Sequence, residues 1–147
     1  MTSPRILLID RHADWLEFAE KTLKQESHDV VTATDFDEAC RRCMDDDFDL
    51  IFVGLDQAES HLATLSDLAK NPNRPQRFVV MFPLRQTFDR VRIVFKAGAY
   101  DVVDKPHQRD ALLRMVANAV HEARLRNGLT DDAKDPAKPA NSQENLS

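Results

Sequence analysis

Hydrophobic residues in this chain occur either in short continuous runs or in longer stretches where they recur every three or four positions. Five runs have the length and branched composition of β-strands: RILLI (5–9), DVVTA (29–33), DLIFV (49–53), RFVVMF (77–82) and YDVV (100–103). The spacing predicts five helices, over 13–27, 35–44, 58–70, 87–97 and 109–127. Asp35 followed by Glu38 is typical of a helix N-terminus, and Gly98 is typical of a left-handed C-cap.

Strands that alternate with helices predict an α/β fold with a five-stranded parallel sheet. Right-handed crossovers then favour a doubly wound topology, with helices on both faces of the sheet. The unbroken run Ile51–Val53 fits a strand that is covered on both sides. We expect one folded domain over 1–127. Residues 128–147 contain almost no large apolar side chains, which predicts a disordered C-terminal tail or linker.

Composition narrows the class of protein. Hydrophobic residues make up 42% of the 147-residue chain, charged residues 31%, and the net charge is −5. The acidic balance gives no general attraction to nucleic acid or anionic membranes, and no apolar run approaches the roughly 20 residues of a membrane span. Because the N-terminus also lacks the layout of a signal peptide, we expect a cytoplasmic protein. Cys40 and Cys43 form a CxxC pattern inside a predicted helix, which favours core packing over a redox or zinc site.

The carboxyl ends of parallel strands meet at one edge of an open sheet, where such folds place their chemistry. The first strand is followed by Asp10, the third ends at Gly54, the fourth is followed by Pro83, and the fifth leads to Lys105. The central strand therefore ends on a residue that has no reactive side chain.

Three segments, ILLID (6–10), FDLIFV (48–53) and GAYDVVDKP (98–106), resemble the receiver domain of two-component response regulators. The resemblance covers about residues 4–126. It implies a flavodoxin-like, CheY-like fold with strand order 2-1-3-4-5. It also implies a domain that accepts a phosphoryl group from a histidine kinase, on an aspartate at the end of strand 3. It also implies two acids that hold Mg²⁺, a Thr or Ser after strand 4, and a Lys after strand 5.

At most of these positions the sequence departs from the family pattern. Asp10 matches the first acid and Lys105 the lysine, but Arg11 occupies the second acid position, Gly54 the acceptor position and Pro83 the hydroxyl position. We therefore expect weak or lost Mg²⁺ binding and no other cofactor or metal. An ion pair of Asp10 with Lys105, or of Arg11 with a nearby carboxylate, should take the place of the metal.

Two further positions follow from the same resemblance. The family often places an aromatic residue three positions before the lysine, where this chain has Val102. The family also makes the Lys–Pro peptide cis, which implies a cis bond before Pro106.

The resulting hypothesis is a degenerate receiver, or pseudo-receiver: a signalling module without enzymatic activity that acts through protein contacts independently of phosphorylation. One alternative is a phosphoacceptor that uses Asp56 as a substitute site. Another is an anion or small-ligand sensor that uses Arg11 and Lys105 in the emptied crevice. His12 and His107 flank the crevice and could respond to pH or an anion, although exposed loop histidines are the simpler interpretation.

The fourth helix is the predicted contact surface. The spacing of Phe88, Val91 and Phe95 predicts a core-facing stripe and leaves Ile93 exposed. In the family, the face of helix 4, strand 5 and helix 5 is the common partner surface. Here that face would carry Arg85, Arg90, Arg92, Ile93, Asp101, Asp110 and Glu122. The expected partners are a histidine kinase, another regulator, an effector or a second copy of the chain, with no direct nucleic-acid or membrane binding.

Overall fold

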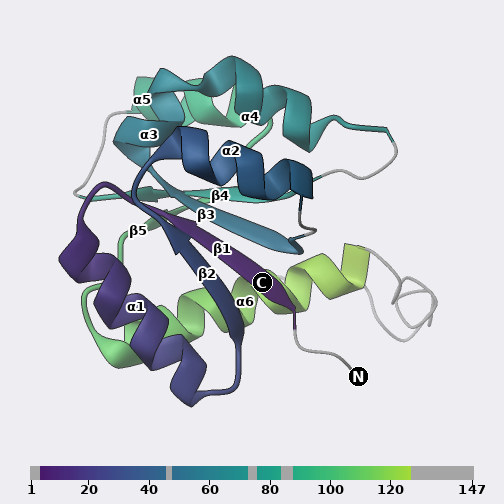
Figure 1. Cartoon of the computed structure of the whole chain (residues 1–147). Helices are drawn as coiled ribbons and strands as arrows, with labels where there is room; N and C mark the ends of the chain where they lie inside the picture. Colours follow the sequence, from purple (N-terminus) through teal and green to yellow (C-terminus); the bar gives the residue numbers. More distant parts are fainter. Residues whose placement is uncertain (1–3, 46–47, 73–75, 84–87, 127–147) are drawn as a thin grey trace, which may run out of the picture. The chain divides into compact units, whose positions relative to one another are not determined.

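Five parallel strands form one sheet in the order β2-β1-β3-β4-β5 (Figure 1). A computed structural model describes residues 4–45, 48–72, 76–83 and 88–126. The strands are β1 (Arg5–Ile9), β2 (Asp29–Ala33), β3 (Leu50–Gly54), β4 (Phe78–Phe82) and β5 (Asp101–Asp104). The doubly wound parallel sheet and the strand order predicted from the sequence are both confirmed, and each predicted strand lies within one residue of its observed bounds.

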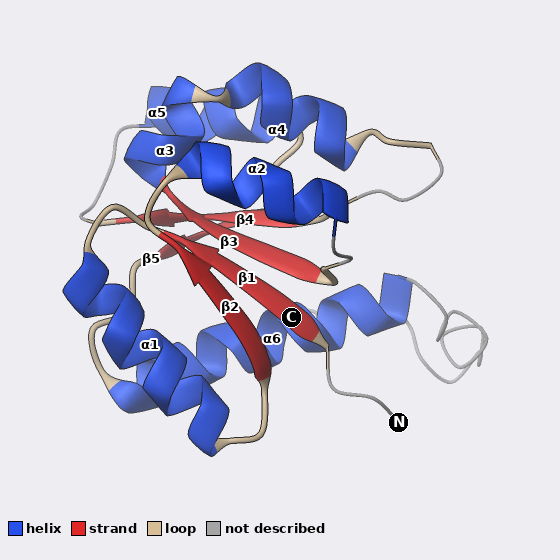
Figure 2. Cartoon of the chain, viewed as in Figure 1, coloured by secondary structure: helices blue, strands red, loops and turns tan. Residues whose placement is uncertain are grey.

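Two compact units divide the chain, Met1–Met115 and Val116–Ser147. The whole sheet belongs to the first unit, and the described part of the second is the C-terminal portion of helix α6. The helices are α1 (Ala13–Gln25), α2 (Phe36–Asp45), α3 (Leu55–Ser60), α4 (Leu62–Ala69), α5 (Phe88–Lys96) and α6 (Arg109–Arg126). Figure 2 shows α2, α3, α4 and α5 on one face of the sheet and α1 on the other.

Burial on both faces explains the unbroken hydrophobic strands. Leu50 through Val53 of β3 and the whole of β4 are buried. Local signals set the helix ends as expected: the carboxylate of Asp35 accepts a hydrogen bond from the backbone N–H of Asp37 at 2.7 Å, and Gly98 has a φ of +108°. Because all five strands are parallel, their carboxyl ends lie at one edge of the sheet.

The predicted single helix over 58–70 is wrong. Two helices, α3 and α4, occupy this stretch, and the first begins at Leu55. They separate at His61, whose ring Nδ1 lies 3.0 Å from the carbonyl oxygen of Gln57. The backbone N–H of His61 donates to Ala58 instead, so the regular helical bond to Gln57 is replaced. The His61 ring also stacks on Phe36 at 4.1 Å between centroids, which fixes the break.

The predicted orientation of the helix at 87–97 is also wrong. Val94 is fully buried and Val91 is partly buried, whereas Phe88 is 76% exposed and Phe95 43% exposed. Two apolar stripes run along α5, and helical spacing alone does not decide which one faces the sheet. Ile93 is exposed, as expected.

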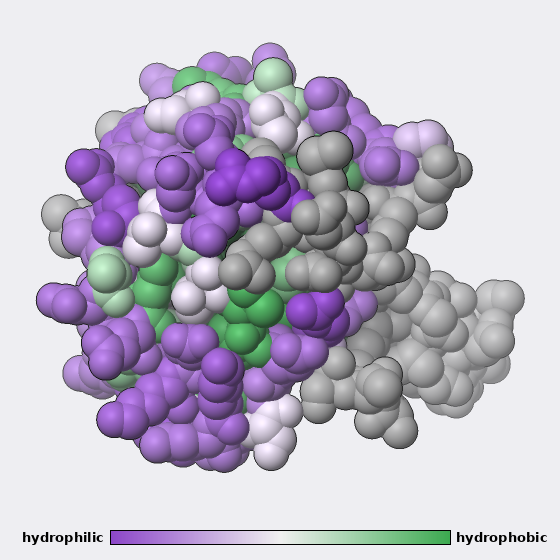
Figure 3. Space-filling view, in the orientation of Figure 1, coloured by the Kyte–Doolittle hydropathy of each residue, from purple (hydrophilic) through white to green (hydrophobic). Residues whose placement is uncertain are grey.

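Some predictions from the sequence concern residues or side chains that the structure does not describe. Cys40 and Cys43 lie within α2 as predicted, but their side chains are not among those described, and the predicted tail at 128–147 lies outside the described residues. Within the described segments, no helix combines the length and apolarity needed to cross a bilayer. The face shown in Figure 3 is largely hydrophilic, with small hydrophobic areas.

Candidate functional site

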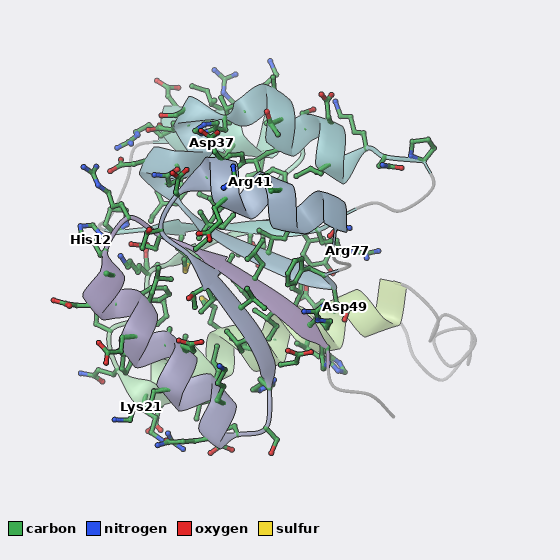
Figure 4. All side chains as sticks on the ribbon, in the orientation of Figure 1. His12, Lys21, Asp37, Arg41, Asp49 and Arg77 are labelled. Atoms are coloured by element: carbon green, nitrogen blue, oxygen red, sulfur yellow. The ribbon has the colours of Figure 1, made fainter. Side chains whose placement is uncertain are left out.

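A crevice opens at the carboxyl ends of the central strands. It is lined by Asp10, Arg11, His12, Gly54, Leu55, Asp56, Gln57, Met81, Pro83 and Lys105. Figure 4 shows His12 at this edge of the sheet, with Asp49 and Arg77 at the opposite end. The fold therefore brings together the residues that follow β1, β3, β4 and β5, as the sequence predicted.

Lys105 and Asp10 form a buried ion pair in the crevice. The Nζ of Lys105 lies 2.9 Å from Oδ2 of Asp10, and the two side chains are 6% and 4% exposed. Trp15 of α1 completes the surroundings of the lysine, because Nζ lies 4.9 Å from the centroid of its ring. The indole N–H of Trp15 in turn donates to the carbonyl oxygen of Pro106 at 2.7 Å. Together these contacts hold the ammonium group of Lys105 against the carboxylate of Asp10.

The second oxygen of Asp10 is engaged by His12. The backbone N–H of His12 donates to Oδ1 at 2.8 Å, and the ring Nδ1 of His12 lies 3.0 Å from the same oxygen. That Nδ1 is also 3.3 Å from Nζ of Lys105. Both oxygens of Asp10 therefore have positively charged or hydrogen-donating neighbours, which satisfies a carboxylate that is removed from water.

Arg11 turns to the other carboxylate at the rim. Its Nη1 lies 2.8 Å from Oδ2 of Asp56, with both side chains more than half exposed. Both ion pairs expected from the sequence, Asp10 with Lys105 and Arg11 with a nearby acid, are thus present.

Gly54 lies directly against the Asp10 carboxylate. Its φ of −65° and ψ of 149° are open to any residue, so backbone conformation does not require glycine here. A Cβ at this position would be 2.9 Å from Oδ2 of Asp10 and 3.6 Å from its Cγ, so the Asp10 side chain would have to shift to make room for it. The missing side chain leaves the room in which Asp10 meets Lys105.

These residues do not match the donor set of a Mg²⁺ site. Mg²⁺ prefers octahedral coordination by oxygen atoms, several of them water, together with one or two carboxylates. The oxygens of Asp10 are directed at Lys105 and His12, and Asp56 is paired with Arg11. Among the described residues, no group of three or more His, Cys, Asp or Glu side chains could hold a metal ion.

Three other positions were predicted from the family resemblance: Pro83, Val102 and Pro106. Pro83 lines the crevice and is exposed, whereas Val102 in β5 packs against the core cluster. The predicted cis bond before Pro106 is wrong, because the described residues contain no cis peptide. Trans is the intrinsically preferred form of an X–Pro bond, and the Pro106 carbonyl already has a partner in Trp15.

The two described arginines of the predicted contact surface differ in how closely they are paired. Arg90 of α5 makes two hydrogen bonds to Glu59 of α3, from Nε at 2.9 Å and from Nη2 at 2.6 Å. These bonds raise the pKa of the Arg90 guanidinium above its ordinary value. Arg92 makes a longer contact, 3.8 Å, to Asp89 of the same helix.

The acidic members of that surface are exposed. Asp101 accepts a hydrogen bond from the backbone N–H of Val102, and Asp110 is exposed at the start of α6. Glu122 is exposed in the second unit, and Arg85 lies outside the described residues.

Sequence reasoning missed Trp15 and Glu59 as parts of these networks. Trp15 lies in the helix predicted over 13–27, and its partners lie 90 and 91 positions further along the chain. Glu59 lies three residues after Asp56, a spacing that places both on one helix face, and this was the available signal.

Comparison with known proteins identifies the family. The profile of the response regulator receiver domain matches residues 6–117, so the chain belongs to this family of signalling domains. Curated proteins give no significant match.

Solved structures agree on the fold. A response regulator from Thermotoga maritima is 22% identical with a TM-score of 0.68, over 80% of this chain and 97% of that chain. A response regulator from Burkholderia pseudomallei, solved with a phosphorylated aspartic acid, calcium and citrate, is 21% identical with a TM-score of 0.64, over 85% and 75%. The beryllofluoride-activated NtrC4 receiver domain dimer is 19% identical with a TM-score of 0.66, over 81% and 98%.

Proposed function

We propose that this chain is a degenerate receiver domain, a pseudo-receiver, which acts in two-component-type signalling through protein contacts and without phosphorylation at the end of β3. The observation that carries the proposal is the position of Gly54 beside the carboxylate of Asp10, which is itself paired with Lys105. Gly54 is the last residue of β3, at the position where the family places its acceptor, and it has no side-chain carboxylate to form an acyl phosphate. The space that an acceptor side chain would need is limited by Oδ2 of Asp10.

The same contacts support the proposal that metal binding is weak or lost. The phosphoryl group of a receiver carries charge that a metal ion and a lysine neutralise. In this crevice the lysine already neutralises Asp10, and Arg11 takes the place of a second acid. We propose that Mg²⁺ binds weakly or not at all and that the domain has no catalytic activity. A cytoplasmic location remains a prediction from the sequence.

Phosphorylation chemistry supplies the direct test. The full chain is incubated with acetyl phosphate and Mg²⁺ and then analysed by intact-mass spectrometry, alongside a receiver domain that is known to react. We expect no mass gain of a phosphoryl group. An acid-labile phosphoryl adduct on an aspartate would overturn the proposal.

Asp56 is the alternative acceptor, and the same experiment tests it. Its side chain is exposed and therefore accessible, but it is paired with Arg11 at 2.8 Å. A mass gain that disappears in Asp56→Asn would establish this alternative. The anion-sensor alternative is less favoured, because Arg11 and Lys105 each already have a carboxylate partner.

Receiver domains interact with kinases, other regulators and effectors, and we propose that α5 forms part of the contact surface here. The large hydrophobic side chains exposed among the described residues, Phe88, Ile93 and Phe95, all lie on this helix. The NtrC4 receiver is a dimer, and a second copy of this chain is one possible partner.

Sedimentation velocity over a range of concentrations tests the second-copy partner, comparing wild type with Phe88→Glu and Ile93→Glu. Self-association that both variants abolish would support a homodimer through α5. A chain that stays monomeric at all concentrations would leave a different protein as the partner.

A further inference from the structure

Helix α3 carries two acids on its outer face, and each is held by an arginine from a different element. Asp56 is paired with Arg11, which follows β1 at the crevice, at 2.8 Å. Glu59, three residues later and on the same helix face, is bound by Arg90 of α5 through two hydrogen bonds. The helix thus connects the rim of the crevice to α5 through two ion pairs.

The two pairs are not independent of each other. The pKa of the Arg90 guanidinium is raised mainly by its hydrogen bond to Glu59; burial opposes this, and the charges of Glu59 and, least of all, Asp56 add to the increase. Asp56 lies one helical turn before Glu59, the residue that binds Arg90, while its own hydrogen bond goes to Arg11. The Asp56 carboxylate therefore attracts both Arg11 and Arg90.

Helix α3 is also short. It spans six residues and ends at the break at His61, and only Leu55 and Ala58 anchor it in the core. A helix of this length has little stability of its own, so contacts made by its side chains have a large share in fixing its position.

We propose that Asp56 is a coupling residue that links the state of the crevice to the α5 surface. While Arg11 holds Asp56, Arg90 remains on Glu59. When Arg11 is drawn away, Asp56 loses its partner and competes with Glu59 for Arg90, which changes the packing of α5 and the presentation of its exposed hydrophobic residues. No covalent step is needed. This inference rests on the proposed function, because α5 is the contact surface proposed above.

Amide hydrogen exchange on the ¹⁵N-labelled full chain tests the coupling. In Arg11→Ala we expect the α5 amides, those of Val91 and Val94 in particular, to exchange about two- to five-fold faster. This range corresponds to the contribution of up to about 1 kcal/mol that exposed ion pairs make. The side-chain Nε–H resonance of Arg90 should shift in the same variant.

The double variant Arg11→Ala/Asp56→Asn separates coupling from a local effect. Once Asp56 is neutral, removal of Arg11 should leave α5 exchange as it is in Asp56→Asn alone. Arg109→Ala is the matched control, because Arg109 also makes an exposed ion pair, with Glu26 at 2.6 Å, away from α3. This control should not change α5.

Two outcomes would overturn the coupling. One is unchanged α5 exchange in Arg11→Ala, and the other is an equal acceleration by Arg11→Ala whether or not Asp56 is neutral. Neither outcome bears on the absence of phosphorylation, which the acetyl phosphate experiment decides by itself.

Discussion

The ammonium of Lys105 lies 2.9 Å from the carboxylate of Asp10, and more than nine-tenths of each side chain is buried. Burying two charges costs several kcal/mol per ion, which only a close pair with additional hydrogen bonds offsets. Here the additional partners are the backbone N–H of His12 and the face of Trp15. The pair is therefore a structural requirement of the crevice, and its two members cannot be removed separately without cost.

Replacing Lys105 alone should destabilise the fold strongly. In Lys105→Met the Asp10 charge remains buried without its counter-charge, which typically costs about 3–5 kcal/mol in the free energy of unfolding. Urea unfolding followed by circular dichroism measures the loss. The double variant Asp10→Asn/Lys105→Met should recover much of it, since no unpaired charge remains. Lys24→Met, which removes an exposed pair with Glu20, should change stability by less than about 1 kcal/mol.

Restoring an acceptor at residue 54 should not restore phosphorylation. Gly54→Asp introduces the carboxylate, but its Cβ meets Oδ2 of Asp10 at 2.9 Å, and Arg11 still takes the place of the second acid. We expect no phosphoryl adduct with acetyl phosphate and Mg²⁺, and reduced thermal stability from the crowding. A single substitution that gained the adduct would show that the remaining crevice is still competent. Gly54→Asp/Arg11→Asp, which supplies a second acid as well, is the informative comparison.

The two arginines of α5 should differ in their effect on stability. Arg90 makes two short hydrogen bonds to Glu59, whereas Arg92 makes one 3.8 Å contact to Asp89 within the same helix. Arg90→Ala should lower the free energy of unfolding by about 1 kcal/mol, and Arg92→Ala should have almost no effect. The difference should shrink in high salt, because both arginines are partly exposed. Equal losses in the two variants would contradict the structural role of the Arg90–Glu59 pair.

Gly98→Ala should destabilise the turn that follows α5. Gly98 has a φ of +108°, which side-chain-bearing residues rarely adopt, and an added Cβ would lie 3.2 Å from the Cβ of Ala69 in α4. We expect a loss of more than about 1 kcal/mol, measured by denaturant unfolding. Gly54→Ala is a useful contrast, because its backbone is unstrained and its loss should depend on Asp10: it should diminish in an Asp10→Ala background, whereas the loss in Gly98→Ala should not.

The sheet could be predicted from the sequence because each strand carries its own signal. Strands buried on both faces are continuous hydrophobic runs, and Ile51 of β3 and Val80 of β4 are buried as those runs predict. The break between α3 and α4 could not be predicted in this way. It depends on the stacking of His61 on Phe36, two residues 25 positions apart, and no helical periodicity contains that information.

The same distinction applies to the crevice. The Asp10–Lys105 pair was predictable because parallel strands place their carboxyl ends together and opposite charges meet there. The hydrogen bond from Trp15 to Pro106, the trans peptide before Pro106 and the outward orientation of Phe88 depend on details of packing between elements. Sequence spacing alone is compatible with either arrangement at each of these places, so it could not predict the observed one.

Trp15 is the single tryptophan of the chain, and it lies in contact with the lysine of the crevice. The intrinsic ultraviolet emission of the protein therefore comes largely from one indole beside the Asp10–Lys105 pair, because the chain has only one tyrosine besides it. Any ion, small molecule or partner that displaces the ammonium group should alter this emission, so the native chain carries its own optical probe and needs no attached dye.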